Sequence, residues 1–162
     1  MNAYFAGGCF WCITPTFKNT NGVIDVTCGY CGGDESNPTY EDVKKQITKH
    51  RETIKIEYDE NIVSYETLLN IFINNVDIND AGGQYIDRGY SYTLAIYYEN
   101  TEQKQIIDKI LQGKNACISI EPLKVFYDAE EYHQDYYLKN PKEFEEELIK
   151  SGRKKWYERR PS

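Results

Sequence analysis

The chain opens with MNAYFAGGCFWC, residues 1–12. Residues 1–6 predict a short strand, the glycine pair that follows predicts a tight turn, and a helix is expected to start close to Cys9. Pro15 is tolerated in the first turn of a helix but not in its interior, so we expect a late start, nearer Cys12. A strand that leads through glycine into a helix is a building unit of layered α/β folds.

Strand-like and helix-like patterns go on alternating along the chain. ETIKIEY at 52–58 alternates strictly, with Ile54, Ile56 and Tyr58 on one face of the predicted strand. This order of elements predicts an α/β or α+β fold in which helices cover a sheet. The same reasoning predicts strands at 23–27 and 91–98, a glycine-rich turn at 29–33, and helices whose caps are Thr39, Ser64, Thr101 and Asn140.

Length and composition limit the classes of protein to which this chain can belong. A chain of 162 residues, 40% hydrophobic and 28% charged, predicts one globular domain, 1–162, and excludes a fibre or a disordered tail. The net charge of −7 argues against nucleic acid as a partner, and the basic segment 150–160 is interpreted as a solvated terminus. The apolar runs are too short to span a membrane, and residues 1–8 do not resemble a signal peptide, so we predict a cytoplasmic protein.

The five cysteines are the most informative feature of the composition, because four of them lie within the first 31 residues. In a reducing compartment cysteines are more often catalytic or metal-binding than bridged. Cys9 and Cys12 form a C-x-x-C pair at a predicted helix start, an arrangement that lowers the pKa of the leading thiol. Cys9 is therefore the candidate nucleophile, and Cys12, one helical turn away, is a candidate disulfide partner.

Two other interpretations of these cysteines remain open. The pairs Cys9/Cys12 and Cys28/Cys31 have the spacing of a four-cysteine zinc site, although two bulky aromatic residues between the first two ligands suit such a site poorly. A buried structural pair is the other possibility. The competing functional hypothesis is therefore general thiol–disulfide exchange or zinc binding by these four residues.

Glu52 is the second candidate for chemistry. Strict alternation places it on the same strand face as Ile54 and Ile56, which should meet the core. A carboxyl group buried there has a raised pKa and can act as a general acid near pH 7. The alternative is a strand end at which the alternation fails and Glu52 faces water. Tyr92 has a similar ambiguity, since buried tyrosines often only satisfy their own hydroxyl groups.

Six motifs complete the pattern, and in their order along residues 3–141 they resemble the peptide methionine sulfoxide reductase A family. The tail at 151–153 is similar to that of a short subgroup of this family. The motifs are Gly8-Cys9-Phe10-Trp11, Gly29-Tyr30-Cys31-Gly32-Gly33, Asn37-Pro38-Thr39-Tyr40, His50-Arg51-Glu52, Asp87-Arg88-Gly89 with Tyr92, and Tyr132-His133-Gln134-Asp135-Tyr136.

The resemblance implies a two-layer sandwich with a ferredoxin-like core and a mixed sheet. It also implies thiol-dependent reduction of methionine-(S)-sulfoxide, peptide-bound or free, with one enzyme for each sulfoxide epimer. No cofactor or metal is expected, and thioredoxin is the expected reductant. The implied roles are nucleophile for Cys9, proton donor for Glu52, hydrogen bonding to the oxygen for Tyr30 and Tyr92, a methyl pocket for Phe10 and Trp11, substrate orientation for Asp87, and a place beside the pocket for Tyr136.

The chain departs from the family pattern near Tyr92. Ser91, Thr93 and Leu94 stand where the family usually has Gln, Arg and Ser. The chain also has no cysteine after Cys117, whereas many members carry resolving cysteines in a C-terminal tail.

The thiol that resolves an oxidised Cys9 is consequently not fixed by the resemblance. Cys12, Cys28, Cys31 and Cys117 are the candidates. We favour Cys12, because residues three apart in a helical turn share a face and need no loop movement to meet.

Overall fold

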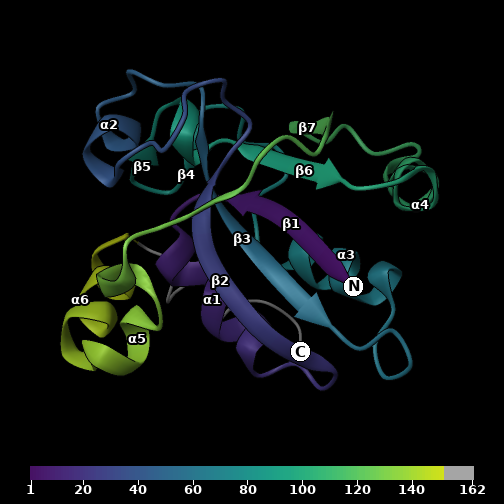
Figure 1. Cartoon of the computed structure of the whole chain (residues 1–162), viewed down its shortest axis with the longest axis horizontal. Coiled ribbons are helices and arrows are strands. Elements are labelled where there is room, and N and C mark those ends of the chain that lie inside the picture. The colour runs from purple at the N-terminus through teal and green to yellow at the C-terminus, as the bar shows by residue number, and fades with distance from the viewer. Residues whose placement is uncertain (152–162) are drawn as a thin grey trace.

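The computed structural model describes residues 1–151, and a sheet with four antiparallel central strands runs through its centre (Figure 1). Strand β1 (Asn2–Gly7) lies between β3 (Arg51–Tyr58) and β6 (Leu94–Tyr98), and β2 (Val23–Cys31) pairs with the other side of β3. The order β6-β1-β3-β2, with helices after β1 and β3, is that of a ferredoxin-like βαββαβ core. The predicted core is confirmed.

Two further strands extend this core. Strand β7 (Ile118–Pro122) adds to β6 in parallel, and β8 (Tyr127–Asp128) adds to β2 antiparallel. Within residues 1–151 the main sheet therefore has six strands and is mixed, as expected. A separate two-stranded ribbon is formed by β4 (Gly83–Gln84) and β5 (Asp87–Arg88).

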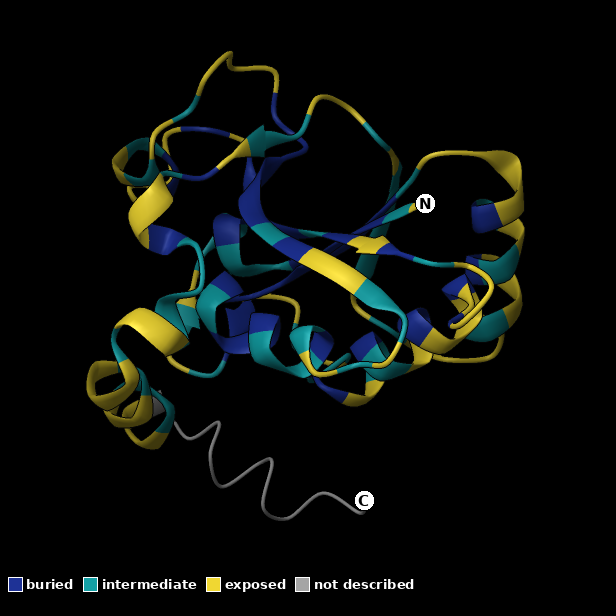
Figure 2. Ribbon diagram, turned by 60° about the horizontal axis from the view of Figure 1, so that its bottom comes forward, coloured by how far each residue is buried: buried dark blue, intermediate teal, exposed yellow. Residues whose placement is uncertain are grey.

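Three helices cover one face of the sheet: α1 (Phe10–Lys18), α3 (Tyr65–Asn74) and α4 (Thr101–Leu111). Their apolar side chains form a core with alternate residues of the strands, and the rings of Phe5 and Phe72 stack at 4.8 Å. Figure 2 shows these buried residues concentrated where the sheet and helices meet. Burial of this apolar area is the main term that holds the two layers together.

The other face of the sheet is covered by an extended segment instead of helices. Residues 123–126 cross it, and Phe126 packs against Tyr4 with ring centroids 5.5 Å apart. Gly29 is required at this crossing, since a Cβ there would lie 2.2 Å from Cζ of Phe126. The chain then continues into three short elements near the start of α1: a 3-10 turn at Glu131–His133, α5 (Tyr136–Lys139) and α6 (Pro141–Ser151).

Two of the predicted helix caps are present. The Asp42 N–H donates to Thr39 Oγ1 at 3.2 Å, which begins α2 (Tyr40–Lys44), and Ser64 accepts from the N–H of Thr67 at 3.1 Å. The cap of α4 was misplaced by one residue, because Asn100 accepts from the Gln103 N–H and Thr101 is already helical. Asparagine is the stronger capping residue. Helix α6 begins at Pro141, as expected.

Three boundaries predicted from the sequence were wrong. Helix α1 begins at Phe10 and contains Pro15. The missing proline N–H removes one hydrogen bond from this helix, and the packing of Ile13 and Phe17 against the sheet offsets that loss. Strand β2 does not end in a turn at 29–33; its ladder with β3 continues to Cys31. The segment predicted as a strand at 91–98 begins with a 3-10 turn, η1 (Tyr90–Tyr92), before β6.

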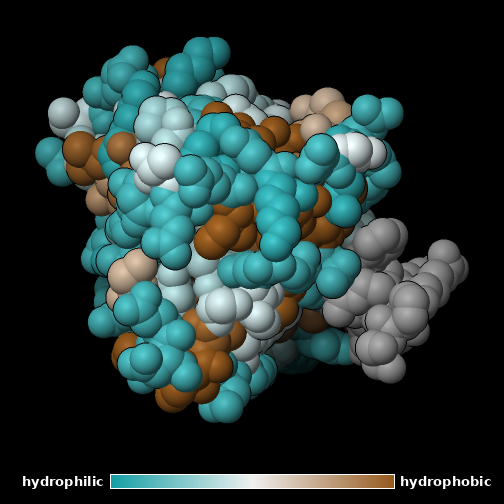
Figure 3. Space-filling view, turned by 90° about the vertical axis from the view of Figure 1, so that its right-hand side faces the viewer, coloured by the Kyte–Doolittle hydropathy of each residue, from teal (hydrophilic) through white to brown (hydrophobic). Residues whose placement is uncertain are grey.

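The surface carries no continuous apolar face in the view of Figure 3, where hydrophilic side chains separate small hydrophobic patches. None of the helices within residues 1–151 is both long and apolar enough to cross a membrane. The predictions for the basic segment beyond Ser151 and for the subgroup tail lie outside the described residues.

Side chains of α1 and α3 pack directly against Gly7, at the end of β1. A Cβ at this position would lie 2.9 Å from Phe72 Cε1 and 3.1 Å from Ile13 Cδ1. We expect Gly7→Ala to lower the free energy of unfolding by about 1–3 kcal/mol through overpacking. Urea denaturation followed by circular dichroism measures this change. An unchanged midpoint would show that α1 and α3 can move apart at no cost.

Candidate active site

Cys9 lies at the junction between β1 and α1. Gly8 has a positive φ of 86°, which lets the chain turn from the strand into the helix. Cys9 follows as the N-cap residue of α1, in an extended conformation, and its side chain makes no capping bond. The residue is 7% exposed. The predicted position of the thiol at a helix start is therefore confirmed.

Glu52 reaches the same junction from β3. It lies on the helix-covered face of the sheet with Ile54 and Ile56 and is 1% exposed, so the interpretation based on strand alternation is confirmed. The N–H of Phe10, in the first turn of α1, donates to Glu52 Oε1 at 3.2 Å. This bond ties the carboxyl group to the residue directly after Cys9.

Burial raises the pKa of Glu52 to about 8, and the charges of Asp87 and Cys12 act in the same direction. Hydrogen bonds from the Phe10 N–H and from Tyr92 oppose this rise but do not cancel it. At neutral pH the carboxyl group therefore retains its proton. A buried carboxylic acid in this state can donate a proton to a bound oxygen.

The pKa of Cys9 is also raised, contrary to the prediction from the C-x-x-C pair. The first cause is a hydrogen bond with Cys12, followed by burial and by electrostatic interactions with Cys12, Glu52 and Asp87. The expectation was wrong because burial and the groups around Cys9 raise its pKa by more than a C-x-x-C pair at a helix start lowers it. Cys9 is consequently a neutral thiol until a partner removes its proton.

A cavity of about 220 Å³ opens at this junction, large enough for one small side chain. It brings together five of the residues predicted from the sequence, although these come from three separate parts of the chain. Its lining consists of Cys9, Trp11, Glu52, Asp87 and Tyr92 together with Tyr40, Lys44 and Glu147.

Trp11 forms a fixed aromatic wall of the cavity. Its indole stacks on Tyr136 with centroids 4.1 Å apart and an interplanar angle of 13°. Its Nε1–H donates to Nδ1 of His133 at 3.0 Å. Burial lowers the pKa of His133 to about 4, so this ring is neutral and can accept the bond. Tyr136 thus lies beside the pocket, at the place that was expected for it.

Phe10 and Tyr30 lie deeper than predicted. Phe10 is fully buried and is absent from the cavity lining; its ring packs 5.1 Å from that of His133 and 5.9 Å from that of Tyr30. The Tyr30 hydroxyl donates to Glu130 Oε1 at 2.9 Å. Glu130 also accepts from the Tyr40 N–H. In this structure Tyr30 therefore supports the wall of the cavity, whereas Tyr92 bonds with Glu52.

Comparison with known proteins agrees with this arrangement. The family model described as peptide methionine sulfoxide reductase matches residues 1–161. The chain belongs to this family. Curated relatives named peptide methionine sulfoxide reductase MsrA include one from Bacillus velezensis, 45% identical and covering 93% of this chain and 90% of the relative, and one from Bacillus subtilis, 42% identical with the same coverage.

Solved structures of similar fold agree with this family assignment. Reduced Mxr1 from Saccharomyces cerevisiae superposes with a TM-score of 0.80 at 29% identity and covers 88% of this chain and 86% of that one. Methionine sulfoxide reductase A of Corynebacterium diphtheriae gives 0.78 at 28% identity, with 86% and 74% covered. A peptide methionine sulfoxide reductase is an oxidoreductase, and a thiol beside a protonated carboxylic acid provides the groups that such a reduction needs.

The alternation of side chains along β2 contradicts the competing zinc hypothesis. Cys28 and Cys31 lie three residues apart in this strand, so their side chains point to opposite faces of the sheet. Cys31 is buried against Tyr97, away from α1. Among residues 1–151, no group of three or more histidine, cysteine or acidic side chains is placed to hold a metal ion.

The candidates for the resolving thiol differ in their surroundings in the structure. Cys12 shares a hydrogen bond with Cys9. Cys28 lies beneath α1, where its sulfur is 3.3 Å from Thr14 Oγ1. Cys117 is exposed just before β7, and its thiol donates to the carbonyl of Asn79. Cys12 is thus the neighbour that a modified Cys9 meets first.

Several residues of the site were not assigned roles from the sequence. Tyr40 and His133 occur within the motifs, so their identity was visible although their contacts were not. Lys44, Glu130 and Glu147 gave no indication of a role, because only tertiary packing brings them to the cavity or its wall.

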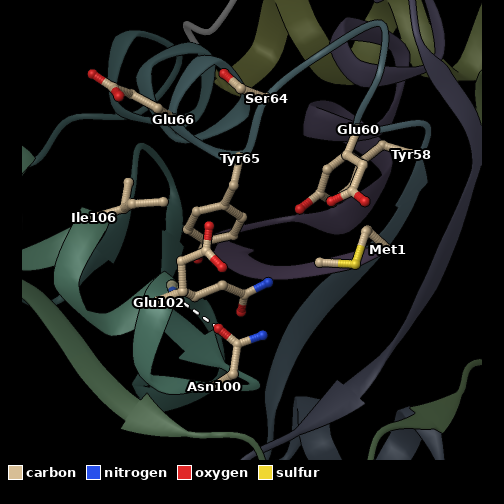
Figure 4. A pocket seen from close by; sticks show the side chains of 10 residues that line it. Met1, Tyr58, Glu60, Ser64, Tyr65, Glu66, Asn100, Glu102 and Ile106 are labelled. Carbon is tan, nitrogen blue, oxygen red and sulfur yellow. Dashed lines mark hydrogen bonds between the residues drawn. The ribbon is translucent and has the colours of Figure 1, made fainter.

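A second hollow, of about 250 Å³, lies near the end of β3, on the order of 20 Å along the strand from Glu52 (Figure 4). Its labelled side chains include Met1, Tyr65, Glu66 and Glu102. Its lining contains no cysteine or histidine, and it therefore lacks the groups for thiol chemistry.

The raised pKa of Glu52 has a consequence for stability. Between its ordinary value of 4.5 and about 8, the folded chain keeps a proton that the unfolded chain releases. The contribution of Glu52 to stability must therefore fall as pH rises through this window. We expect Glu52→Gln to gain stability relative to the unmodified chain from pH 5 to pH 8. Parallel urea titrations measure the difference, and a constant difference across this range would contradict a buried, protonated Glu52.

Proposed function

We propose that this chain reduces methionine-(S)-sulfoxide, peptide-bound or free, with Cys9 as the nucleophile and Glu52 as the proton donor. The observation that carries the proposal is that both groups line one small cavity and are linked through the Phe10 N–H. Trp11 offers an apolar face for the methyl group of the substrate, and Tyr92 and Asp87 offer polar groups on the same cavity wall.

In the first step Glu52 donates its proton to the sulfoxide oxygen, which makes the substrate sulfur more electrophilic. The resulting carboxylate lies near Cys9 and accepts the thiol proton as the Cys9 sulfur attacks. The S–O bond of the substrate breaks and its hydroxyl group is transferred to the Cys9 sulfur, so methionine leaves and Cys9 becomes a sulfenic acid. Methionine sulfoxide is reduced by two electrons and Cys9 is oxidised by two. The raised pKa values of both groups suit this exchange, since both begin neutral.

In the second step the Cys12 thiol attacks the sulfenic sulfur. A Cys9–Cys12 disulfide forms and water leaves. The hydrogen bond between the two side chains supports this choice, because it places the resolving group in contact with Cys9 before the reaction starts.

An external dithiol then restores the two thiols by disulfide exchange. We propose thioredoxin for this role, in the cytoplasm, where cysteines such as these five are kept reduced. The yeast protein Mxr1 has been solved in complex with Trx2, which makes a partner of this class reasonable. No resident cofactor is required, and residues 1–162 act as a single catalytic domain.

Glu52→Gln tests the proton donor. The variant keeps the size of the side chain but cannot release a proton, so the first step should slow by about 10²–10⁴-fold. Rapid-quench assays of methionine formed in a single turnover, without reductant, measure this rate. In the unmodified chain the rate should fall as pH rises through about 8, the pKa of Glu52. Less than a threefold loss would remove Glu52 from this role.

Cys12→Ser tests the resolving thiol. The variant should still form one methionine per chain but should turn over slowly with thioredoxin, because its sulfenic acid has no adjacent thiol. Peptide mapping by mass spectrometry after one turnover should find a Cys9–Cys12 disulfide in the unmodified chain.

Two matched variants serve as controls for this test. Cys31→Ser removes a cysteine from the opposite face of the sheet and should cycle normally, whereas Cys9→Ser should form no methionine. A Cys9–Cys31 or Cys9–Cys28 disulfide, together with normal cycling of Cys12→Ser, would overturn the assignment.

A further inference from the structure

The 3-10 turn η1 places Tyr92 in the catalytic cavity, and side chains remote in sequence hold this turn from two sides. The backbone of the turn is closed by the Tyr92 N–H, which donates to the Gly89 carbonyl at 3.0 Å. A single turn of this kind has weak intrinsic stability, so its position depends on outside contacts.

Gln46, in the loop after α2, supplies one set of these contacts. Its Oε1 accepts from the Ser91 N–H at 2.9 Å, and its Nε2 donates to Ser91 Oγ at 2.8 Å and to the Lys44 carbonyl at 3.1 Å. Gln46 itself has a positive φ of 63°, an unfavourable conformation for this residue type. The amide therefore bridges the α2 loop and the residue directly before Tyr92.

Arg51, which precedes Glu52 in β3, holds the other side of the turn. Its Nε donates to Thr93 Oγ1 at 2.8 Å, and its guanidinium lies 4.4 Å from the centre of the Tyr90 ring. Nη1 is anchored to Glu121 at 2.7 Å. With Ser91 and Thr93 both held, Tyr92 is the residue of the turn whose side chain lines the catalytic cavity.

We propose that Gln46 is a positioning residue for the sulfoxide-reducing site: its amide holds η1 so that the Tyr92 hydroxyl stays in hydrogen-bonding contact with Glu52. Arg51 supports the same turn from β3. This inference rests on the proposed function, because it assigns Gln46 an effect on the step that Glu52 performs.

Gln46→Gly is the informative variant, since glycine adopts a φ of 63° without strain and the fold is therefore retained. Loss of the Tyr92 bond should slow the first step by about three- to tenfold. Because that bond lowers the pKa of Glu52, the fall of the rate at alkaline pH should shift to higher pH. Single-turnover rates with methionine sulfoxide, measured from pH 6 to pH 10, give both quantities.

A double-mutant cycle with Tyr92→Phe separates positioning from a general loss of structure. If Gln46 acts through Tyr92, Gln46→Gly should have no further effect in the Tyr92→Phe background. An effect of equal size in both backgrounds, or an unchanged rate and pH profile in Gln46→Gly alone, would overturn the proposal.

Gln103→Ala provides the matched control. Its amide also makes two backbone bonds, to Asn2 and Glu99, but these lie in α4 and the neighbouring strands. It should lower stability without moving the pH profile, and a shifted profile here would also overturn a specific role for Gln46. If the unmodified chain forms no methionine in a single turnover, the proposed function is wrong. If the unmodified chain is active and Gln46→Gly has a normal first step, only the role of Gln46 is wrong.

Discussion

The structure depends on one unfavourable arrangement, a carboxyl group buried at the first turn of a helix. Glu52 is 1% exposed, and its neutral form is preferred because water is absent. The Phe10 N–H, free at the helix start, gives the carboxyl a partner. This contact joins β3 to the turn between β1 and α1. It therefore sets the distance between the proton donor and Cys9.

The order of the sheet makes this contact possible. Strand β3 lies beside β1 although some 45 residues of chain separate them, and the start of β3 lies next to the end of β1 because the strands are antiparallel. Both Cys9 and Glu52 then lie at the same end of these two central strands, at the start of α1. Two further helices complete the site: α2 contributes Tyr40 and Lys44, and α6 contributes Glu147.

The cysteines have identical side chains, but the fold gives them different surroundings and therefore different reactivity. Burial raises the pKa of Cys28 and of Cys31 to about 12, so both stay protonated. Cys9 is buried as well, but it lines the cavity and has Cys12 and the acid of Glu52 as neighbours. The difference lies in the cavity and in the neighbouring acid, because burial raises the pKa of all three thiols.

The sequence by itself determined the strand, glycine turn and helix that carry Cys9, the strand alternation that buries Glu52, and the motifs of the family. These are local or periodic properties, and neighbouring residues fix them. Only the tertiary structure decided that Cys28 and Cys31 point to opposite faces, that Tyr30 bonds with Glu130, and that Gln46 reaches Ser91. The same is true of the raised pKa of Cys9. Each of these depends on contacts between segments far apart in the chain, and no local pattern encodes which partner, or which burial, a side chain will meet.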